Sequence, residues 1–170
     1  MKKVVCFLIF CGLLFGFLQV SIDRTIIPLE GSYNPALNVM ITLGMPKHEV
    51  DALLGESEFL DGRTDFYFND DPKNRIAIQY DYASVKVLSI RVYSSGWRVY
   101  EPSCYVGADV LQLPEHFEGS YTNKWYRCMF DKDGQPVSLS EWWDAICSID
   151  ARFEDGRIAV VFVGKPSIKL

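Results

Sequence analysis

Two alternating runs in the middle of the chain most constrain its fold. Apolar and polar residues alternate through residues 75–81 (RIAIQYD) and 85–93 (VKVLSIRVY), and only residues 82–84 separate the runs. A period of two predicts β-strands with one buried face, and the short connection predicts that the strands are antiparallel. Asp-Gly pairs at residues 61–62 and 155–156 are typical of further hairpin turns. We therefore expect an antiparallel sheet.

A short helix is predicted just before these strands, within ITLGMPKHEVDALLGE (residues 41–56). Pro46 suits the first helical position, where its missing N–H would be unpaired in any case. Val50, Leu53 and Leu54 fall on one helical face, and Gly55 provides the left-handed residue that ends many helices. Such a short helix persists only when it packs on other structure, so we expect its apolar face to cover the sheet.

A second helix is predicted within residues 138–149 (SLSEWWDAICSI). Ser138 and Glu141 have the spacing of a capping box. Its apolar stripe, which we expect to be buried, consists of Leu139, Trp142, Trp143 and Ile146. The expected fold class is therefore α+β, with short helices packed on one face of an antiparallel β-sheet and a hydrophobic segment preceding them.

The alternation also predicts which side chains face away from the first helix. We place the more apolar set under the helix: Phe66, Phe68, Ile76, Ile78, Tyr80, Leu88, Ile90 and Val92. The opposite face then presents Tyr67, Arg75, Gln79, Arg91 and Tyr93. Tyrosine and arginine commonly anchor protein interfaces, so Tyr67, Gln79, Arg91 and Tyr93 are our candidate protein-binding residues. The alternative is that the second half of the chain covers this face.

The N-terminal segment, residues 1–24, is typical of a signal peptide or a membrane anchor. Lys2 and Lys3 precede an uncharged run over residues 4–22, and Asp23 and Arg24 follow it. Leading lysines favour a cytoplasmic N-terminus and an extracytoplasmic domain. The run is close to the minimum length for spanning a bilayer and lacks a clear cleavage site. The domain is thus either anchored to the inner membrane or released to the periplasm.

The rest of the chain divides into a tether and a domain. Residues 25–40 contain Pro28, Gly31, Asn34 and Pro35 and read as an irregular tether. Residues 41–170 then form a single globular α+β domain, or two degenerate helix-plus-sheet halves at 41–99 and 100–170. The domain's cysteines are Cys104, Cys128 and Cys147. Either two of them pair in an oxidising compartment, or all three are buried thiols.

The opening helix also carries a family resemblance. Its pattern, Leu43-Gly44-Met45 followed by Glu49-Val50 and Leu53-Leu54-Gly55, resembles the LGM-x-x-x-E-V-x-x-L-L-G helix of bacterial envelope domains. These are the SmpA/OmlA-type outer-membrane-assembly lipoproteins and the β-lactamase inhibitory proteins. The resemblance implies a helix on an antiparallel sheet and a role in binding other proteins without catalysis. Pro46 stands where those families often have Thr or Ser.

Motifs for other functions are missing from the sequence. It has no G-x-S-x-G, phosphate-binding glycine loop, dinucleotide fingerprint or H-E-x-x-H, so we expect no enzyme activity, cofactor or metal site. The net charge of −5, without a basic cluster, argues against nucleic-acid binding. We therefore predict an envelope domain that binds another protein, as an assembly factor or an inhibitor or immunity protein. The alternative is a small extracytoplasmic hydrolase that uses Asp and Glu residues.

Overall fold

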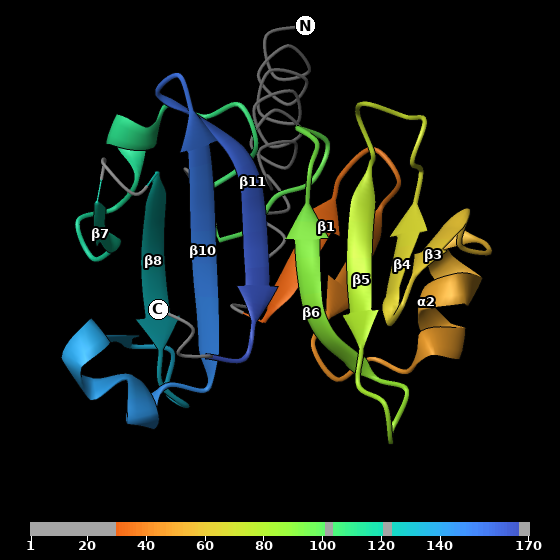
Figure 1. The fold of residues 1–170 in the computed structure, drawn as a ribbon, viewed down its shortest axis with the longest axis horizontal. Helices are drawn as coiled ribbons and strands as arrows, with labels where there is room; N and C mark the ends of the chain where they lie inside the picture. The colour runs from red at the N-terminus through yellow and green to blue at the C-terminus, as the bar shows by residue number, and fades with distance from the viewer. Residues whose placement is uncertain (1–29, 101–103, 121–123, 167–170) are drawn as a thin grey trace, which may run out of the picture.

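The computed structural model describes residues 30–100, 104–120 and 124–166, which form two antiparallel sheets (Figure 1). A two-stranded sheet pairs β1 (Gly31–Asn34) with β2 (Val39–Thr42). The large sheet has the order β3-β4-β5-β6-β11-β10-β8-β7, and β9 also pairs with β8. Its strands are β3 (Phe59–Asp61), β4 (Thr64–Tyr67), β5 (Ile76–Tyr80), β6 (Val87–Val92), β7 (Glu118–Ser120), β8 (Trp125–Phe130), β9 (Pro136–Val137), β10 (Cys147–Glu154) and β11 (Arg157–Gly164).

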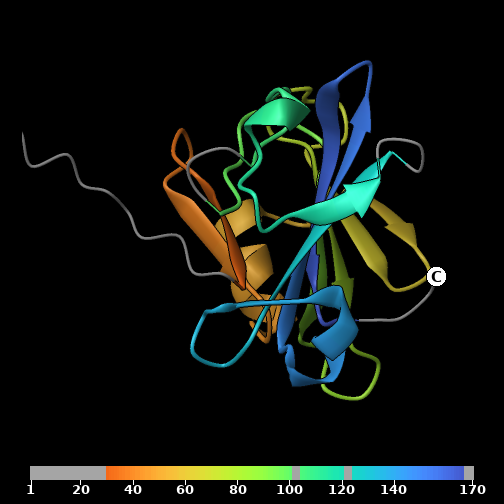
Figure 2. The same cartoon turned by 90° about the vertical axis from the view of Figure 1, so that its left-hand side faces the viewer.

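The large sheet has one covered face and one open face. The hairpin β1–β2 and the helix α2 (Lys47–Leu54) both lie behind the sheet as drawn in Figure 1, and Figure 2 shows them on one side of it. We call this covered side the back face and the opposite side the front face. Cross-strand pairs such as Ile78↔Ile90, Ile90↔Val163 and Val163↔Ile149 carry the core across four strands of the back face.

The fold class differs from the α+β expectation, because the described chain is predominantly antiparallel β-sheet with a single α-helix. This helix, α2, falls where it was predicted, and its Val50 and Leu54 are buried. Leu53, expected on the same buried face, is 47% exposed. The apolar leader expected before the domain lies outside the described residues. Within the described ranges, no helix is long and apolar enough to span a membrane.

The second predicted α-helix is wrong. Residues 139–144 form the 3-10 helix η2 (Leu139–Asp144), in which Glu141 has a non-helical backbone. Its four apolar residues, Leu139, Trp142, Trp143 and Ile146, are all exposed. The stripe that predicted burial therefore packs on no core, and β9 and β10 leave few residues between them for a longer helix. Ser138 still caps the turn by accepting a hydrogen bond from the Ser140 amide.

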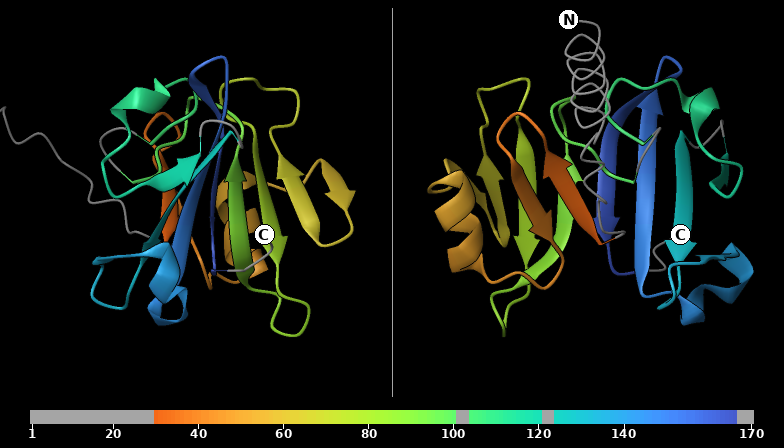
Figure 3. Two further views of the ribbon diagram at one scale, coloured as in Figure 1. Left: turned by 60° about the vertical axis from the view of Figure 1, so that its left-hand side comes forward. Right: turned by 180° about the vertical axis from the view of Figure 1, so that it is seen from behind.

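The segment expected to be an irregular tether, residues 25–40, contains regular structure from residue 31 onward. Gly31–Asn34 pairs with Val39–Thr42, and Tyr33 exchanges backbone hydrogen bonds with Arg98 at 2.9 and 2.7 Å. Asn34 stabilises the turn between these strands, because its side-chain oxygen accepts hydrogen bonds from the backbone amides of Ala36 and Leu37. Gly31, Asn34 and Pro35, which suggested a tether, thus belong to a hairpin that covers the core (Figure 3), whereas Pro28 lies outside the described residues.

The two halves of the chain share one sheet rather than forming repeated units. Strand β11 of the second half pairs with β6 of the first, from Val161↔Val92 to Gly164↔Ser89. The described part of residues 100–170 contains no α-helix, so it does not repeat a helix-plus-sheet unit. Cys104, Cys128 and Cys147 are all buried thiols, which is the second of the two alternatives for the cysteines.

Candidate functional site

The front face of the sheet is the surface that the sequence analysis singled out. No described helix or strand outside the sheet lies over it (Figures 1 and 2). The second half of the chain extends the sheet sideways instead of covering this face. Gln79, Arg91 and Tyr93 come to the front face as predicted, since register places Gln79 and Arg91 opposite to the core residues Ile78 and Ile90.

Arg75 lies between two aromatic rings on this face. Its guanidinium carbon is 6.0 Å from the centre of the Phe66 ring and 5.2 Å from the centre of the Tyr93 ring. Attraction between a guanidinium and a ring face contributes about 0.5–1 kcal/mol at exposed sites. The Arg75 Nε atom is buried and has no hydrogen-bond partner. The two rings therefore orient the Arg75 guanidinium, whose Nε–H group has no hydrogen-bond acceptor.

Arg91 is held in a similar way by the neighbouring strand. Its guanidinium carbon is 5.8 Å from the centre of the Phe162 ring, and Arg91 and Phe162 are directly paired across β6 and β11. On its other side Arg91 pairs with Ala77, which is too small to compete for that space. A Cβ atom at Gly164 would come within 2.7 Å of the Phe162 ring. The glycine thus makes room for the ring on which Arg91 rests.

Further along the front face, other arginines are neutralised. Arg127 binds Asp150 through two hydrogen bonds, Nε to Oδ1 at 2.5 Å and Nη2 to Oδ2 at 2.8 Å. The hydrogen bond to Asp150 raises the pKa of Arg127 against the effect of its burial. Arg152 forms an ion pair with Glu154 at 3.3 Å. In contrast, Arg75 and Arg91 form no ion pair with any described residue.

Gln79 lies beside a row of small side chains on the front face. The register aligns Gln79, Ser89, Gly164 and Ser148 across β5, β6, β11 and β10. The Ser89 hydroxyl donates to the Gln79 side-chain oxygen at 3.2 Å. Ser89, Gly164 and Ser148 are buried although they lie on this face, so larger neighbouring side chains such as Phe162 and Arg91 form more of its surface.

Tyr67, the fourth candidate, is not on the front face. Pairing of Tyr67 with Ile76 and of Asp65 with Ile78 places both on the back face, whereas Phe66 is on the front. The aromatic residues 66–68 gave no alternation to read, and Phe68 leaves the strand with a left-handed φ of 55°. The predicted facing of β4 was therefore wrong by one residue, with Phe66 rather than Tyr67 on the front face. Tyr67 is only 1% exposed and cannot contact a partner there.

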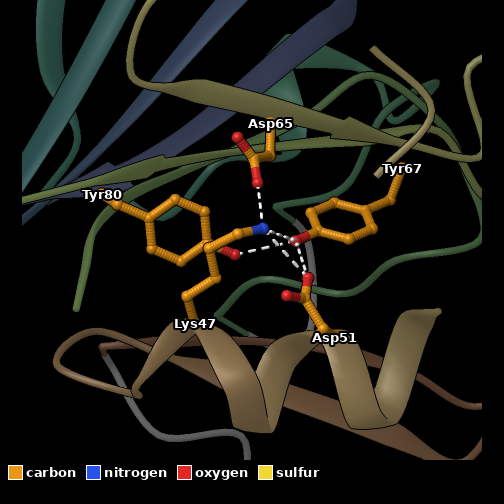
Figure 4. Close-up of polar contacts among 5 residues, drawn as sticks. All are labelled: Lys47, Asp51, Asp65, Tyr67 and Tyr80. Atoms are coloured by element: carbon orange, nitrogen blue, oxygen red, sulfur yellow. Dashed lines mark hydrogen bonds and ion pairs between the residues drawn. The ribbon is translucent and has the colours of Figure 1, made fainter. Parts of the chain in front are cut away.

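Tyr67 instead belongs to a polar network that ties α2 to the sheet (Figure 4). Its hydroxyl donates to Asp51 of the helix at 2.7 Å and lies 2.9 Å from the Tyr80 hydroxyl, which donates to it. Lys47, at the start of α2, forms ion pairs with Asp51 at 3.1 Å and with the buried Asp65. Each carboxylate thus has a cation or hydroxyl donor, as burial requires.

The protonation of this network does not favour proton-transfer chemistry near neutral pH. Burial is the main cause of the raised pKa of Tyr67, and hydrogen bonds to Tyr80 and Asp51 add to it. Burial likewise raises the pKa of Tyr80 to about 12. Burial opposes charge on Lys47, but hydrogen bonds to Asp65 and Asp51 outweigh it and raise the lysine pKa. All three groups stay protonated, so the network reads as a structural link.

The sequence missed two aromatic members of the front face, Phe66 and Phe162. Phe66 was assigned to the core, and Phe162 was part of a hairpin whose two faces were not distinguished. The alternation in RIAVVFVG (residues 157–164) was weak because five of its residues are large and apolar. Within the described ranges, no group of three or more His, Cys, Asp or Glu residues is arranged to hold a metal ion.

Comparison with known proteins identifies no family for the chain. No protein-family model matches the sequence, and the search of curated proteins gives no significant match. Among solved structures, the chain is similar to a DUF4309 family protein, YjgB of Bacillus subtilis subsp. subtilis strain 168. The two share 15% identity with a TM-score of 0.43, over 71% of this chain and 78% of that protein. A similarity at this level carries no argument about fold or function. The resemblance to SmpA/OmlA-type and β-lactamase inhibitory proteins stays a prediction.

Proposed function

We propose that the protein is a non-catalytic binding domain of the bacterial envelope that recognises another protein through the front face. The observation that carries this proposal is the pair Arg75 and Arg91. Each is held against aromatic rings on an open sheet face, and neither has an ion-pair partner among the described residues. Arginine and tyrosine side chains that are already oriented lose little conformational freedom on binding.

The carboxylates of the chain give less support to the hydrolase alternative. The most buried cluster contains Asp51 and Asp65, and both are engaged by Lys47. A general acid needs a carboxyl group with a raised pKa and access to substrate. Asp65 is buried against its lysine, and Asp51 accepts from Tyr67 as well. We therefore favour binding over hydrolysis.

The envelope location is part of the proposal and is supported by the sequence alone. The uncharged residues 4–22 behind two lysines favour an anchor in the inner membrane or export to the periplasm. Either location gives the front face access to envelope proteins. An assembly factor and an inhibitor or immunity protein both fit, and they differ in phenotype. Deleting an assembly factor alters envelope permeability, whereas an inhibitor rescues cells from one toxin or enzyme.

The front face is tested by affinity capture from membranes of the native cells, using the full-length chain. A variant carrying Tyr93→Ala and Phe162→Ala should lose a specific partner that the wild-type chain retains. The matched control is Leu53→Ala with Tyr82→Ala, which removes exposed apolar side chains outside the front face. Equal capture by the wild-type chain and the front-face variant, with both folded by circular dichroism, would refute the proposed site.

A further inference from the structure

Two arginines of the front face carry positive charge that no described carboxylate pairs with. The chain has a net charge of −5. On the front face lie four arginines, Arg75, Arg91, Arg127 and Arg152, and four acidic residues, Asp61, Glu118, Asp150 and Glu154. Two of the four, Arg127 and Arg152, are paired with acidic neighbours. The remaining positive charge, on Arg75 and Arg91, is not neutralised by any described carboxylate.

The geometry of these two arginines suits carboxylates. A guanidinium binds a carboxylate through two parallel hydrogen bonds, as Arg127 does with Asp150 on this same face. Arg75 has an Nε donor without an acceptor. Because Nε is buried, an incoming carboxylate would pair with the terminal nitrogens of the Arg75 guanidinium, which no described carboxylate engages. Lysine side chains of a partner would instead be repelled.

We propose that the segment of the partner that docks on the front face is acidic, with carboxylates that pair with Arg75 and Arg91. Apolar side chains between the carboxylates contact Phe162 and Tyr93. This inference rests on the proposed function and specifies its partner. Although the chain as a whole is acidic, Arg75 and Arg91 supply positive charge at this site that no described carboxylate pairs with.

The test uses the full-length chain and two short capped peptides, one alternating glutamate with valine and the other alternating lysine with valine. NMR shift changes upon titration should occur at front-face residues with the glutamate peptide and be absent with the lysine peptide. Replacing both arginines, Arg75→Gln with Arg91→Gln, should weaken binding of the glutamate peptide at least about tenfold, and added salt should weaken it in the wild-type chain. The variant Arg75→Lys with Arg91→Lys keeps the charge, so its affinity for the glutamate peptide should lie between those of the wild-type chain and the double glutamine variant.

The matched control is Arg63→Gln with Lys132→Gln, which removes the same charge from exposed positions away from the front face. It should leave binding within about twofold of the wild type. The inference is overturned if the wild-type chain does not bind the glutamate peptide, if the lysine peptide binds as well, or if the control weakens binding as much as the front-face pair. The capture experiment with Tyr93→Ala and Phe162→Ala tests the proposed function separately. If the arginine variants still retain a partner that this aromatic variant loses, the result refutes the acidic character of the partner segment and leaves the front face as the binding site.

Discussion

The three buried thiols make a prediction about alkaline stability that the structure quantifies. Cys104, Cys128 and Cys147 are each at most 2% exposed. Burial in the core raises the pKa of each thiol from an ordinary value of 9.0 to about 12. Because the folded-state pKa is raised, the folded chain holds these protons where the unfolded chain releases them. Their contribution to stability is complete below about pH 9 and is lost between about pH 9 and 12.

The size of the loss follows from proton linkage. One pH unit above its unfolded pKa, each thiol lowers the free energy of unfolding by about 1.4 kcal/mol, so three lower it by about 4 kcal/mol near pH 10. Near pH 11 the three together remove about 8 kcal/mol, comparable with the total stability of about 5–15 kcal/mol for a typical domain. The raised pKa values of Tyr67 and Tyr80 act in the same direction. We therefore expect cooperative unfolding near pH 11.

The assay is urea unfolding at several pH values under reducing conditions, with the free energy of unfolding plotted against pH. The wild-type slope above the unfolded thiol pKa should be about −4 kcal/mol per pH unit, and Cys147→Ala should reduce its magnitude by about a third. The variant will be less stable at every pH because of its cavity, but only the slope tests the linkage. A wild-type slope shallower than about −1.4, or an unchanged slope in Cys147→Ala, would refute the burial of ionisable thiols.

Three substitutions test other features. Val85 has a left-handed φ of 52° and a half-exposed side chain, so Val85→Asn should raise stability by about 1 kcal/mol; a lower melting temperature would contradict this. Tyr67→Phe should cost about 1–3 kcal/mol in urea unfolding because Asp51 and Tyr80 lose a partner, whereas Tyr82→Phe, at an exposed position, should cost nothing measurable. Trp143 is 64% exposed, so Trp143→Ser should change stability by less than about 0.5 kcal/mol, and a loss above about 2 kcal/mol would place Trp143 in a core.

Much of the sheet could be predicted from the sequence because its strands alternate clearly. Strands β5 and β6 were predicted from a period of two, and the Asp-Gly turns at 61–62 and 155–156 both connect hairpins. Helix α2 was predicted from Pro46, its apolar spacing and Gly55. Strands β1 and β2 were missed because each has four residues and their turn contains proline. Such short strands depend on tertiary contacts, here with Arg98, which no local pattern reveals.

The candidate site was predicted in part, for a comparable reason. Alternation placed Arg75, Gln79, Arg91 and Tyr93 on one face, and they lie there. Tyr67 was assigned to the wrong face because residues 66–68 are all aromatic and show no alternation. Its hydrogen bonds with Lys47 and Asp51 hold it on the back face. That network joins residues 20 and 16 positions apart. The exposure of Trp142 and Trp143 was likewise invisible to helical spacing, which shows a stripe but not whether anything covers it.

Site-specific cross-linking tests the binding face most directly. A photoreactive aromatic residue at position 162, 79 or 93 is compared in native cells with the same residue at position 53, on the exposed side of α2. We predict a covalent adduct with one protein from the front-face positions and none with that protein from position 53. Adducts with the same protein from position 53, or no adduct from any front-face position, would contradict recognition through the front face.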